Sequence, residues 1–361
     1  MGTAPELGAL RNRTGCPKDE GLYELPLQGY ACSSFSSPFP QHPETVRQVP
    51  SDSPRGSMLP GMIGVIVRPY YIRADDTCVT AWSTACIPFP PYKPHDWRAD
   101  FRDDLRAAIA RLPSRQGKVL SAAYRSPISE GADLENLLIY NIFDARLSSI
   151  ARNGLIFERF YHVSRECPVP LSSQALCQYE YRLADEESSS LEEQSGRELA
   201  FLSFELPPRV PEGPTSVWYA AKKGHITRAL GDHREKPWGI SLAIRVPPSS
   251  RITCSNIVKP LIDGITSALH YHSGLNIKEL SERLDRILGL GDSTSMKPLL
   301  LNNTNALFGT IDLLCCHGKN VQWNPQDGYC TYCSMRCFRD LPGTRVEVTA
   351  RIFDIDQREV V

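Results

Sequence analysis

The chain has 361 residues with 40 basic and 41 acidic side chains, so its formal net charge is −1. A charge this close to zero gives no bulk attraction for nucleic acid, and no apolar run is long enough to span a bilayer. The N-terminal residues lack the basic and apolar regions of a secretory signal, so we expect a cytoplasmic protein with no membrane partner. This length predicts a sizeable core, in two domains or in one large domain with insertions.

The first part of the chain is rich in Ser, Pro and Gln and shows no helical or strand period, which predicts a flexible leader over residues 1–57. An N-terminal α/β part is expected over residues 58–183. Its apolar periodicity predicts a strand at 63–72, a helix at 97–112, a strand at 118–125 and a helix at 134–153.

Residues 184–198 hold several Glu residues and three consecutive serines, which predicts an acidic flexible loop and a boundary. A C-terminal α/β part is expected over residues 199–361. Its predicted strands are 199–206, 216–220, 238–246, 308–315 and 344–354, and its predicted helices are 256–270 and 277–288. Strands that alternate with helices predict a mixed α/β (α+β) fold, with a sheet packed against helices.

One pattern occurs twice along the chain. A strand, a loop and an apolar helix with Asn near its start occur around Asn136 and again around Asn256. Two such strand-loop-helix units are typical of a pseudo-symmetric domain, although a strand followed by a capped helix is also a common local pattern.

The second of these units carries an amide, an ammonium and a carboxylate at its strand-to-helix corner, from Asn256, Lys259 and Asp263. Such a corner can hold phosphate or a divalent cation. The alternative interpretation is an N-cap followed by a solvated Lys.

These residues resemble the motif of the RusA-type Holliday-junction resolvases, which runs Asp-x-Asp-Asn, apolar, x, Lys, and then Asp a turn later. The resemblance covers residues 238–295, with Asn256, Lys259 and Asp263 at matching positions and Asp292 as a match for a further family Asp. It implies an endonuclease that binds magnesium through its acids and assists at the phosphate through its Lys. This chain departs from the motif because Thr253 and Ser255 stand where the paired acids would be.

The first unit keeps the alternating acids that the second unit lacks, in the sequence Asp133-Leu134-Glu135-Asn136. Two carboxylates at a helix start can share a hard cation such as Mg²⁺ if a third acid, Asp144 or Asp263, approaches them. If the two units pack side by side, Asp133 and Glu135 complete a catalytic site around Lys259. The alternative is that both acids only favour the helix dipole and cap the first turn.

A cysteine-rich block near the C-terminus, within residues 315–337, predicts a zinc site. Its candidate ligands are Cys315, Cys316, His317, Cys330, Cys333 and Cys337. A C-x-x-C pair with further Cys and His upstream suits tetrahedral zinc, whereas free or partly buried thiols are the alternative.

A basic and aromatic stretch between residues 209 and 259 can follow a phosphate backbone and stack bases. The residues expected to contact nucleic acid are Lys222, Lys223, Arg228, Arg234, Lys236 and Asn256. A local patch of this kind also occurs in proteins with no nucleic-acid partner.

Three functions therefore remain open from the sequence. The first is a protein that binds DNA or RNA through a RusA-like core, degenerate or with a rearranged set of acids. In its active version, a magnesium-dependent nuclease, Asp133, Glu135 and Asp263 hold the magnesium and Lys259 contacts the scissile phosphate. The second is a non-catalytic interaction or scaffold protein with structural zinc. The third is a small-molecule enzyme whose pocket cannot be read from the sequence. A homodimer is a further possibility that the sequence leaves open.

Overall fold

The structure of the chain, a computed structural model, covers most of the sequence beyond residue 67. The described ranges are 68–87, 96–113, 117–127, 133–142, 145–163, 166–185, 196–207, 213–229, 236–309, 313–317, 320–325 and 327–355, with residues 211 and 233. The predicted leader at 1–57 lies outside these ranges. So does the middle of the predicted acidic loop, from residue 186 to residue 195.

The N-terminal part of the described chain contributes five strands, which are β1 (Tyr70–Ala74), β2 (Cys78–Ser83), β3 (Lys118–Arg125), β4 (Gly154–Phe160) and β5 (Cys177–Asp185). Between β2 and β3 lies α1 (Trp97–Ile109). Between β3 and β4 lie three short helices, α2 (Leu134–Leu138), η1 (Tyr140–Ile142) and α3 (Ala145–Ile150). Strands β3 and β4 are parallel, as a helical crossover allows, and β5 pairs antiparallel with both β3 and β2.

The C-terminal part contributes β6 (Glu198–Leu206), β7 (His225–Arg228), β8 (Trp238–Arg245), β11 (Cys330–Phe338) and β12 (Val346–Asp354) to the same sheet. Helix α4 (Pro214–Lys223) follows β6, and α5 (Cys254–Ala268) follows β8. Between α5 and β11 lie α6 (Ile277–Leu288), η3 (Ser293–Ser295), α7 (Met296–Leu301), the small hairpin of β9 (Leu314–His317) and β10 (Asn320–Trp323), and η4 (Asp327–Tyr329).

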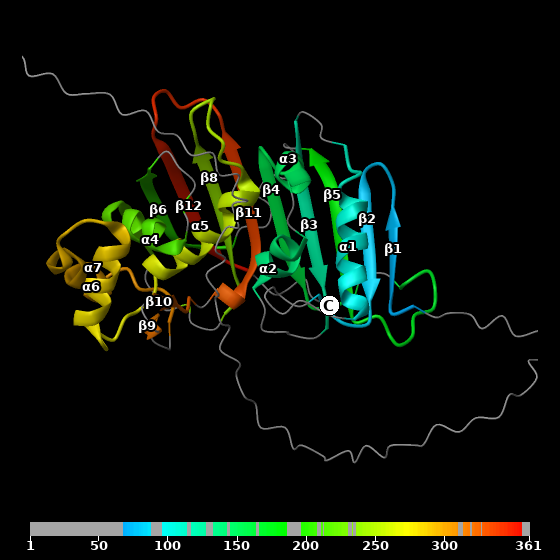
Figure 1. Cartoon of the computed structure of the whole chain (residues 1–361), viewed down its shortest axis with the longest axis horizontal. Helices are drawn as coiled ribbons and strands as arrows, with labels where there is room; N and C mark the ends of the chain where they lie inside the picture. Colours follow the sequence, from blue (N-terminus) through cyan, green and yellow to red (C-terminus); the bar gives the residue numbers. More distant parts are fainter. Residues whose placement is uncertain are drawn as a thin grey trace, which may run out of the picture. The chain divides into compact units, whose positions relative to one another are not determined.

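The order of the ten strands has the symmetry of a palindrome: β1-β2-β5-β3-β4-β11-β8-β12-β6-β7 (Figure 1). In each half, four strands lie between the edge strand and the centre of the sheet: β2-β5-β3-β4 in one half and β6-β12-β8-β11 in the other. Counted towards the centre, their first two pairings are antiparallel and the third is parallel. The halves meet where β4 pairs antiparallel with β11, with Ile156 opposite Ser334. Antiparallel pairing of two equivalent strands places a pseudo-two-fold axis between them. The edge strands β1 and β7 break the symmetry because they come at different points in the chain order.

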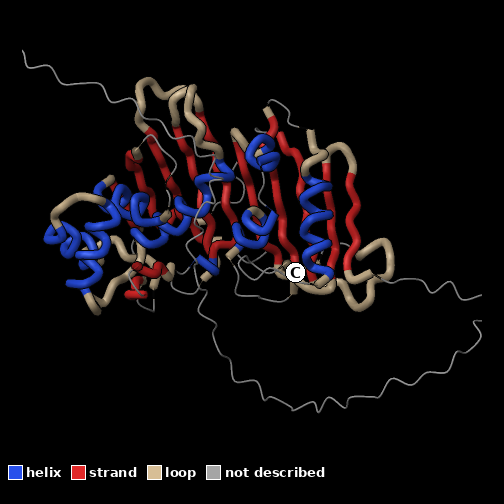
Figure 2. The backbone as a smooth tube through the Cα atoms, in the orientation of Figure 1, coloured by secondary structure: helices blue, strands red, loops and turns tan. Residues whose placement is uncertain are grey.

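The predicted fold class is therefore confirmed, and both predicted strand-loop-helix units are present, as β3 with α2 and β8 with α5. Helices α1 to α5 lie over one face of the sheet, whereas α6 and α7 lie beside it (Figure 1 and Figure 2). Phe101 and Leu105 of α1 and Leu261 of α5 are fully buried in the same apolar cluster as the strand residues beneath them. This burial is the main favourable contribution to the fold and holds each helix start at a fixed place above the sheet.

One predicted strand is wrong, because residues 216–220 lie within helix α4. Gly213 and Gly224 flank this helix and Pro214 occupies its first turn, where the missing N–H costs nothing. Val217 and Ala221 lie one turn apart on its buried face.

The predicted helix at 134–153 is also wrong as one element, because it is divided into α2, η1 and α3. All five residues of α2 are buried, so the segment has no solvent face and does not follow the pattern of a long surface helix. The predicted strand at 308–315 begins only at Leu314, and Phe308 makes an isolated bridge with His270.

Most of the other predicted elements are confirmed, but several strands of the structure were not predicted. The predicted elements at 97–112, 118–125, 199–206, 238–246, 256–270, 277–288 and 344–354 correspond to α1, β3, β6, β8, α5, α6 and β12. Of the predicted strand at 63–72, the described part contributes to β1. No strand was predicted from the sequence for the segments that form β2, β4, β5, β7, β10 and β11. The buried strand β11 lies in the cysteine-rich block, where the spacing of thiols was interpreted as a metal motif.

The contact between α4 and α5 depends on Gly264, and this gives a first prediction. A Cβ at this position would lie 2.5 Å from Cβ of Val217 and 3.0 Å from the carbonyl of Pro214. We expect Gly264→Ala to lower the free energy of unfolding by about 1–3 kcal/mol, because two packed helices must separate. Urea unfolding measures this. Gly328→Ala is the control, since a Cβ there meets nothing within 4 Å; equal midpoints for the two variants would contradict the prediction.

Candidate metal and phosphate site

The two strand-loop-helix units pack side by side, and their polar residues meet at one point. Lys259 of α5 places its Nζ 2.7 Å from a Glu135 carboxylate oxygen and 3.6 Å from one of Asp133, both belonging to the first unit. The same Nζ lies 3.1 Å from Asp263, one turn further along α5. The site that the sequence predicts around Lys259 is thus assembled from both halves of the fold.

Asp133 stands at the N-cap position of α2, but its carboxylate makes no capping bond to the helix backbone. Instead it accepts a hydrogen bond of 2.8 Å from the side-chain amide of Asn136. Glu135 lies in the first turn of the same helix, yet it is buried and directed at Lys259. Capping therefore does not account for the position of either carboxylate.

In the second unit, by contrast, the N-cap is Thr253 rather than Asn256, and Asn256 takes part in the cap from the third helical position. Its side-chain oxygen accepts from the backbone N–H of Thr253 at 2.9 Å, as one half of a capping box. Lys259, however, is not a solvated lysine, because only 15% of its side chain is exposed.

A fourth carboxylate, that of Asp327, was missed in the sequence analysis. It begins η4, the short 3-10 helix just before the central strand β11, and only 5% of it is exposed. The local sequence Asn-Pro-Gln-Asp-Gly indicates only a turn. The family resemblance implied a further Asp, which was matched to Asp292. That residue is instead exposed and caps the 3-10 helix η3.

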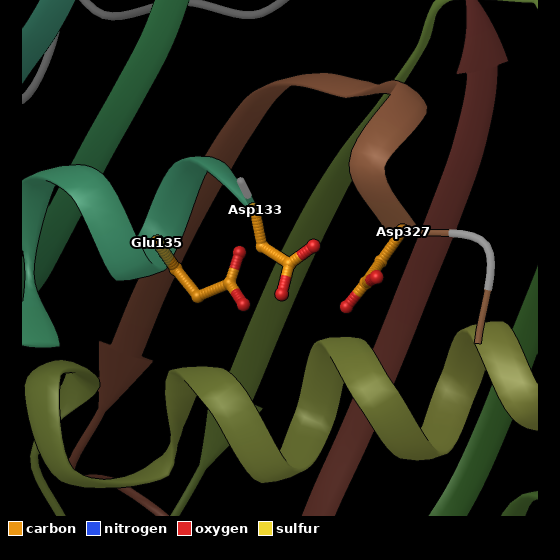
Figure 3. Close-up of side chains that lie close together, drawn as sticks. All are labelled: Asp133, Glu135 and Asp327. Carbon is orange, nitrogen blue, oxygen red and sulfur yellow. The ribbon is translucent and has the colours of Figure 1, made fainter. Parts of the chain in front are cut away.

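Asp133, Glu135 and Asp327 form a group that could hold a metal ion. One carboxylate oxygen from each lies within 4.8 Å of the other two, and the three side chains converge above α5 (Figure 3). The second oxygen of Glu135, Oε2, is buried and has no hydrogen-bond partner within the described structure. An orphaned carboxylate oxygen beside two further carboxylates is a donor set that suits a hard cation such as Mg²⁺ or Mn²⁺.

Within the described residues, four carboxylates surround the Lys259 ammonium at this site: those of Asp133, Glu135, Asp263 and Asp327. Burial, with added repulsion from Asp133 and Asp263, raises the pKa of Glu135 to about 7 despite the attraction of Lys259. Burial and the neighbouring acids also raise the pKa of Asp327 well above its ordinary value. Burial alone would lower the pKa of Lys259, but the surrounding carboxylates, Asp263 first, raise it well above its usual value. Lys259 therefore stays charged, and the excess negative charge is relieved by protons when no cation is bound.

This imbalance predicts a pH dependence of stability in metal-free protein. A carboxyl whose pKa is higher in the folded state than in the unfolded chain contributes stability at low pH and loses it as the pH rises through the folded value. With EDTA present, we expect unfolding free energy to fall by about 1–3 kcal/mol between pH 5 and pH 8, and excess Mg²⁺ to abolish this fall. Urea unfolding at several pH values measures it.

Glu135→Gln is the control for this titration. In that variant the fall between pH 5 and pH 8 should shrink, because the group with the raised pKa is gone. A wild-type stability that rises with pH in EDTA over this interval would contradict the assignment.

The positions of the predicted zinc ligands are more dispersed. Cys330, Cys333 and Cys337 are buried on β11, whereas on β9 Cys315 is exposed and Cys316 is half-buried. Cys333 and Cys337 are four residues apart on an extended strand, about 13 Å at ~3.3 Å per residue. Zinc binds sulfur at about 2.3 Å, so these two thiols cannot share one ion. The side chain of His317 lies outside the described residues. Zinc binding by a set of these ligands that does not combine Cys333 with Cys337 stays a prediction.

The residues expected to contact nucleic acid lie mainly on α4 and β7, at the β7 end of the sheet. Lys222 donates to the carbonyl of Asn302 at 2.9 Å, and Arg228 donates to that of Thr304 at 3.5 Å. Both thereby connect their elements to the segment after α7. Lys223 and Lys236 are exposed.

Two of the sequence candidates cannot be placed. Arg234, from the basic stretch, and Asp144, considered as a third acid, both lie outside the described residues.

Comparison with known proteins adds no assignment: no family model, no curated protein and no solved structure matches this chain. None of the helices in the described part of the chain combines the length and the hydropathy that a bilayer span requires.

Proposed function

We propose that this protein is a divalent-cation-dependent phosphodiester hydrolase that acts on nucleic acid, with DNA as its substrate. The proposal is carried by one observation: the carboxylates of Asp133, Glu135 and Asp327 lie together beside the Lys259 ammonium in a largely buried site. Phosphodiester hydrolysis needs charge compensation on the phosphate and an activated water, and carboxylate-bound Mg²⁺ supplies both.

The residues of the chain have distinct parts in this proposal. Asp133, Glu135 and Asp327 would hold the cation, with the free oxygen of Glu135 as one ligand. Asp263 holds Lys259 from one turn further along the helix and keeps its ammonium directed into the site. Lys259 is then placed to neutralise a phosphate oxygen of the bound strand.

The side-chain exposures indicate how the strand would approach. Asp133 has 25% of its side chain exposed, compared with 1% for Glu135 and 7% for Asp263. The site therefore meets solvent at Asp133, and a phosphate would enter from that side.

The preference for nucleic acid rests on the family motif, whose parts are divided between the two halves. The first unit has the alternating acids and Asn in Asp133, Glu135 and Asn136, and the second has the Lys and the following Asp in Lys259 and Asp263. Neither half holds the full set, but the structure brings the two sets into contact. The resemblance to RusA-type resolvases makes branched and duplex DNA the first substrates to examine.

The test is a cleavage assay with the full chain on labelled four-way junctions, linear duplex, single-stranded DNA and RNA. Mg²⁺ or Mn²⁺ should support cleavage of DNA, EDTA should abolish it, and Glu135→Gln purified in the same way should be inactive. Cleavage of RNA alone would overturn DNA as the substrate. Salt-sensitive binding without cleavage, or neither binding nor cleavage, would overturn the hydrolase proposal.

A further inference from the structure

The pseudo-two-fold axis between β4 and β11 gives the catalytic corner a counterpart. The N-cap residues Asp133 and Thr253 begin α2 and α5, and Asn136 and Asn256 occupy the same third helical position after them. At the first corner, the start of α2 contacts α5 through Lys259. At the second corner, which we call the twin corner, the start of α5 contacts α3, where Ser255 Oγ lies 3.2 Å from Ser148 Oγ.

The twin corner has hydroxyls where the first corner has acids. Thr253 and Ser255 take the positions of Asp133 and Glu135, and their side-chain oxygens lie 3.2 Å from each other. Ile139, which is fully buried, stands at the position in the first helical segment that Lys259 has in α5. A neutral hydroxyl network of this kind binds no hard cation strongly, because it supplies no negative charge.

Among the described residues, the two segments that meet at the twin corner contain no acid; Asp144, which precedes the second of them, lies outside these residues. Residues 251–262 and residues 145–154 contain neither Asp nor Glu. The first of these segments opens α5, and the second covers α3 and the approach to β4. Asp327 stands three residues before β11, and Ala151 stands three residues before β4.

We infer that the two-fold frame of this protein contains one hydrolytic centre, so that each binding event cuts one strand of a duplex and leaves a nick. The inference rests on the proposed function. A pseudo-symmetric protein with a cation site at each corner would cut both strands in one encounter, because each site would activate its own water. Here the second corner keeps the fold of the first without its cation ligands.

The experiment follows a supercoiled plasmid incubated with the full chain and Mg²⁺, with protein below the concentration of plasmid. Nicked circles should accumulate until the supercoiled form is consumed, and linear DNA should appear only afterwards, through independent second nicks. Linear DNA formed together with the first nicked circles would overturn the single-centre inference and leave the hydrolase proposal intact. No cleavage of this plasmid or of the labelled DNAs would overturn both.

A matched pair of variants separates the two corners. Glu135→Gln and Ser255→Ala alter equivalent positions in the pseudo-symmetric frame. We expect Glu135→Gln to abolish nicking and Ser255→Ala to leave its rate within about threefold of wild type, since Ser255 lies in the corner without ligands. Loss of nicking in a folded Ser255→Ala protein, judged by an unchanged melting temperature, would show that the twin corner takes part in the reaction and would overturn the inference.

Discussion

Replacing Glu135 by Gln is expected to lower magnesium-dependent DNA cleavage by a factor on the order of 10³. The substitution keeps the shape of the side chain but removes the charge of the most deeply buried carboxylate of the metal group, whose free oxygen is offered to the cation. Losses of this size are typical when one precisely placed electrostatic partner of a reacting phosphate or oxyanion is removed. Single-turnover cleavage of a labelled duplex measures the effect.

The control for this prediction is Asp292→Asn. Asp292 is the acid that the family resemblance first indicated, but it is exposed, and in the contacts described its carboxylate accepts only from Thr294. Its substitution should leave cleavage within about twofold of wild type. Equal losses in the two variants would contradict the assignment of the site.

Misfolding would not explain the loss in Glu135→Gln. In metal-free protein above pH 7, Glu135 adds negative charge to a cluster that already has an excess of it. We therefore expect the variant to melt at or above the temperature of wild type in EDTA at pH 8. A clearly lower melting temperature would indicate a structural rather than a catalytic effect.

Replacing Lys259 by Met is the second change with a large expected effect, here on both stability and activity. It leaves Asp133, Glu135, Asp263 and Asp327 without the ammonium that attracts all four in metal-free protein. Removal of one partner from a buried charge cluster costs about 3–5 kcal/mol, and we expect this loss in EDTA at pH 8. Cleavage should also fall at least tenfold, because no ammonium faces the phosphate.

Two measurements distinguish this effect from simple loss of packing. Urea unfolding should show that Lys259→Met regains part of the lost stability at pH 5, because the carboxyls with raised pKa take up protons there. Excess Mg²⁺ should also restore part of it. Lys236→Met, at an exposed lysine, should change stability by no more than about 0.5 kcal/mol. A Lys259→Met protein as stable as wild type in EDTA at pH 8 would show that the carboxylates do not need Lys259.

Burial is the physical cause behind the elements that the sequence predicted well. Helix α6 and strand β3 have bounds that match their predictions. Helix α6 has the apolar period that burial on one side requires, whereas β3 is a short run of apolar and small residues buried on both faces. The segment that forms α2, η1 and α3 has apolar residues on every side. Apolar periodicity alone therefore could not show where the helix is interrupted. Strand β11 is buried within the sheet and rich in Cys, and its composition indicated metal chemistry more than a strand.

Among the site residues, the corners themselves were predictable from the sequence. Alternating acids before Asn136, and a Lys and an Asp spaced along the helix after Asn256, are local patterns that need no tertiary information. The hypothesis that they meet was stated from the sequence but rested on the condition that the two units pack side by side. Asp327 had no local signal beyond a turn.

The sequence by itself determined the mixed α/β class, the two strand-loop-helix units and the residue types at each corner. It did so because period and spacing are properties of neighbouring residues. Only the tertiary structure decided that β4 pairs with β11, that Lys259 reaches Glu135 from the other half of the fold, and that Asp327 lies beside them. These are approaches between segments far apart in the chain. They are set by burial of the helices on a shared sheet, which no local pattern of residues encodes.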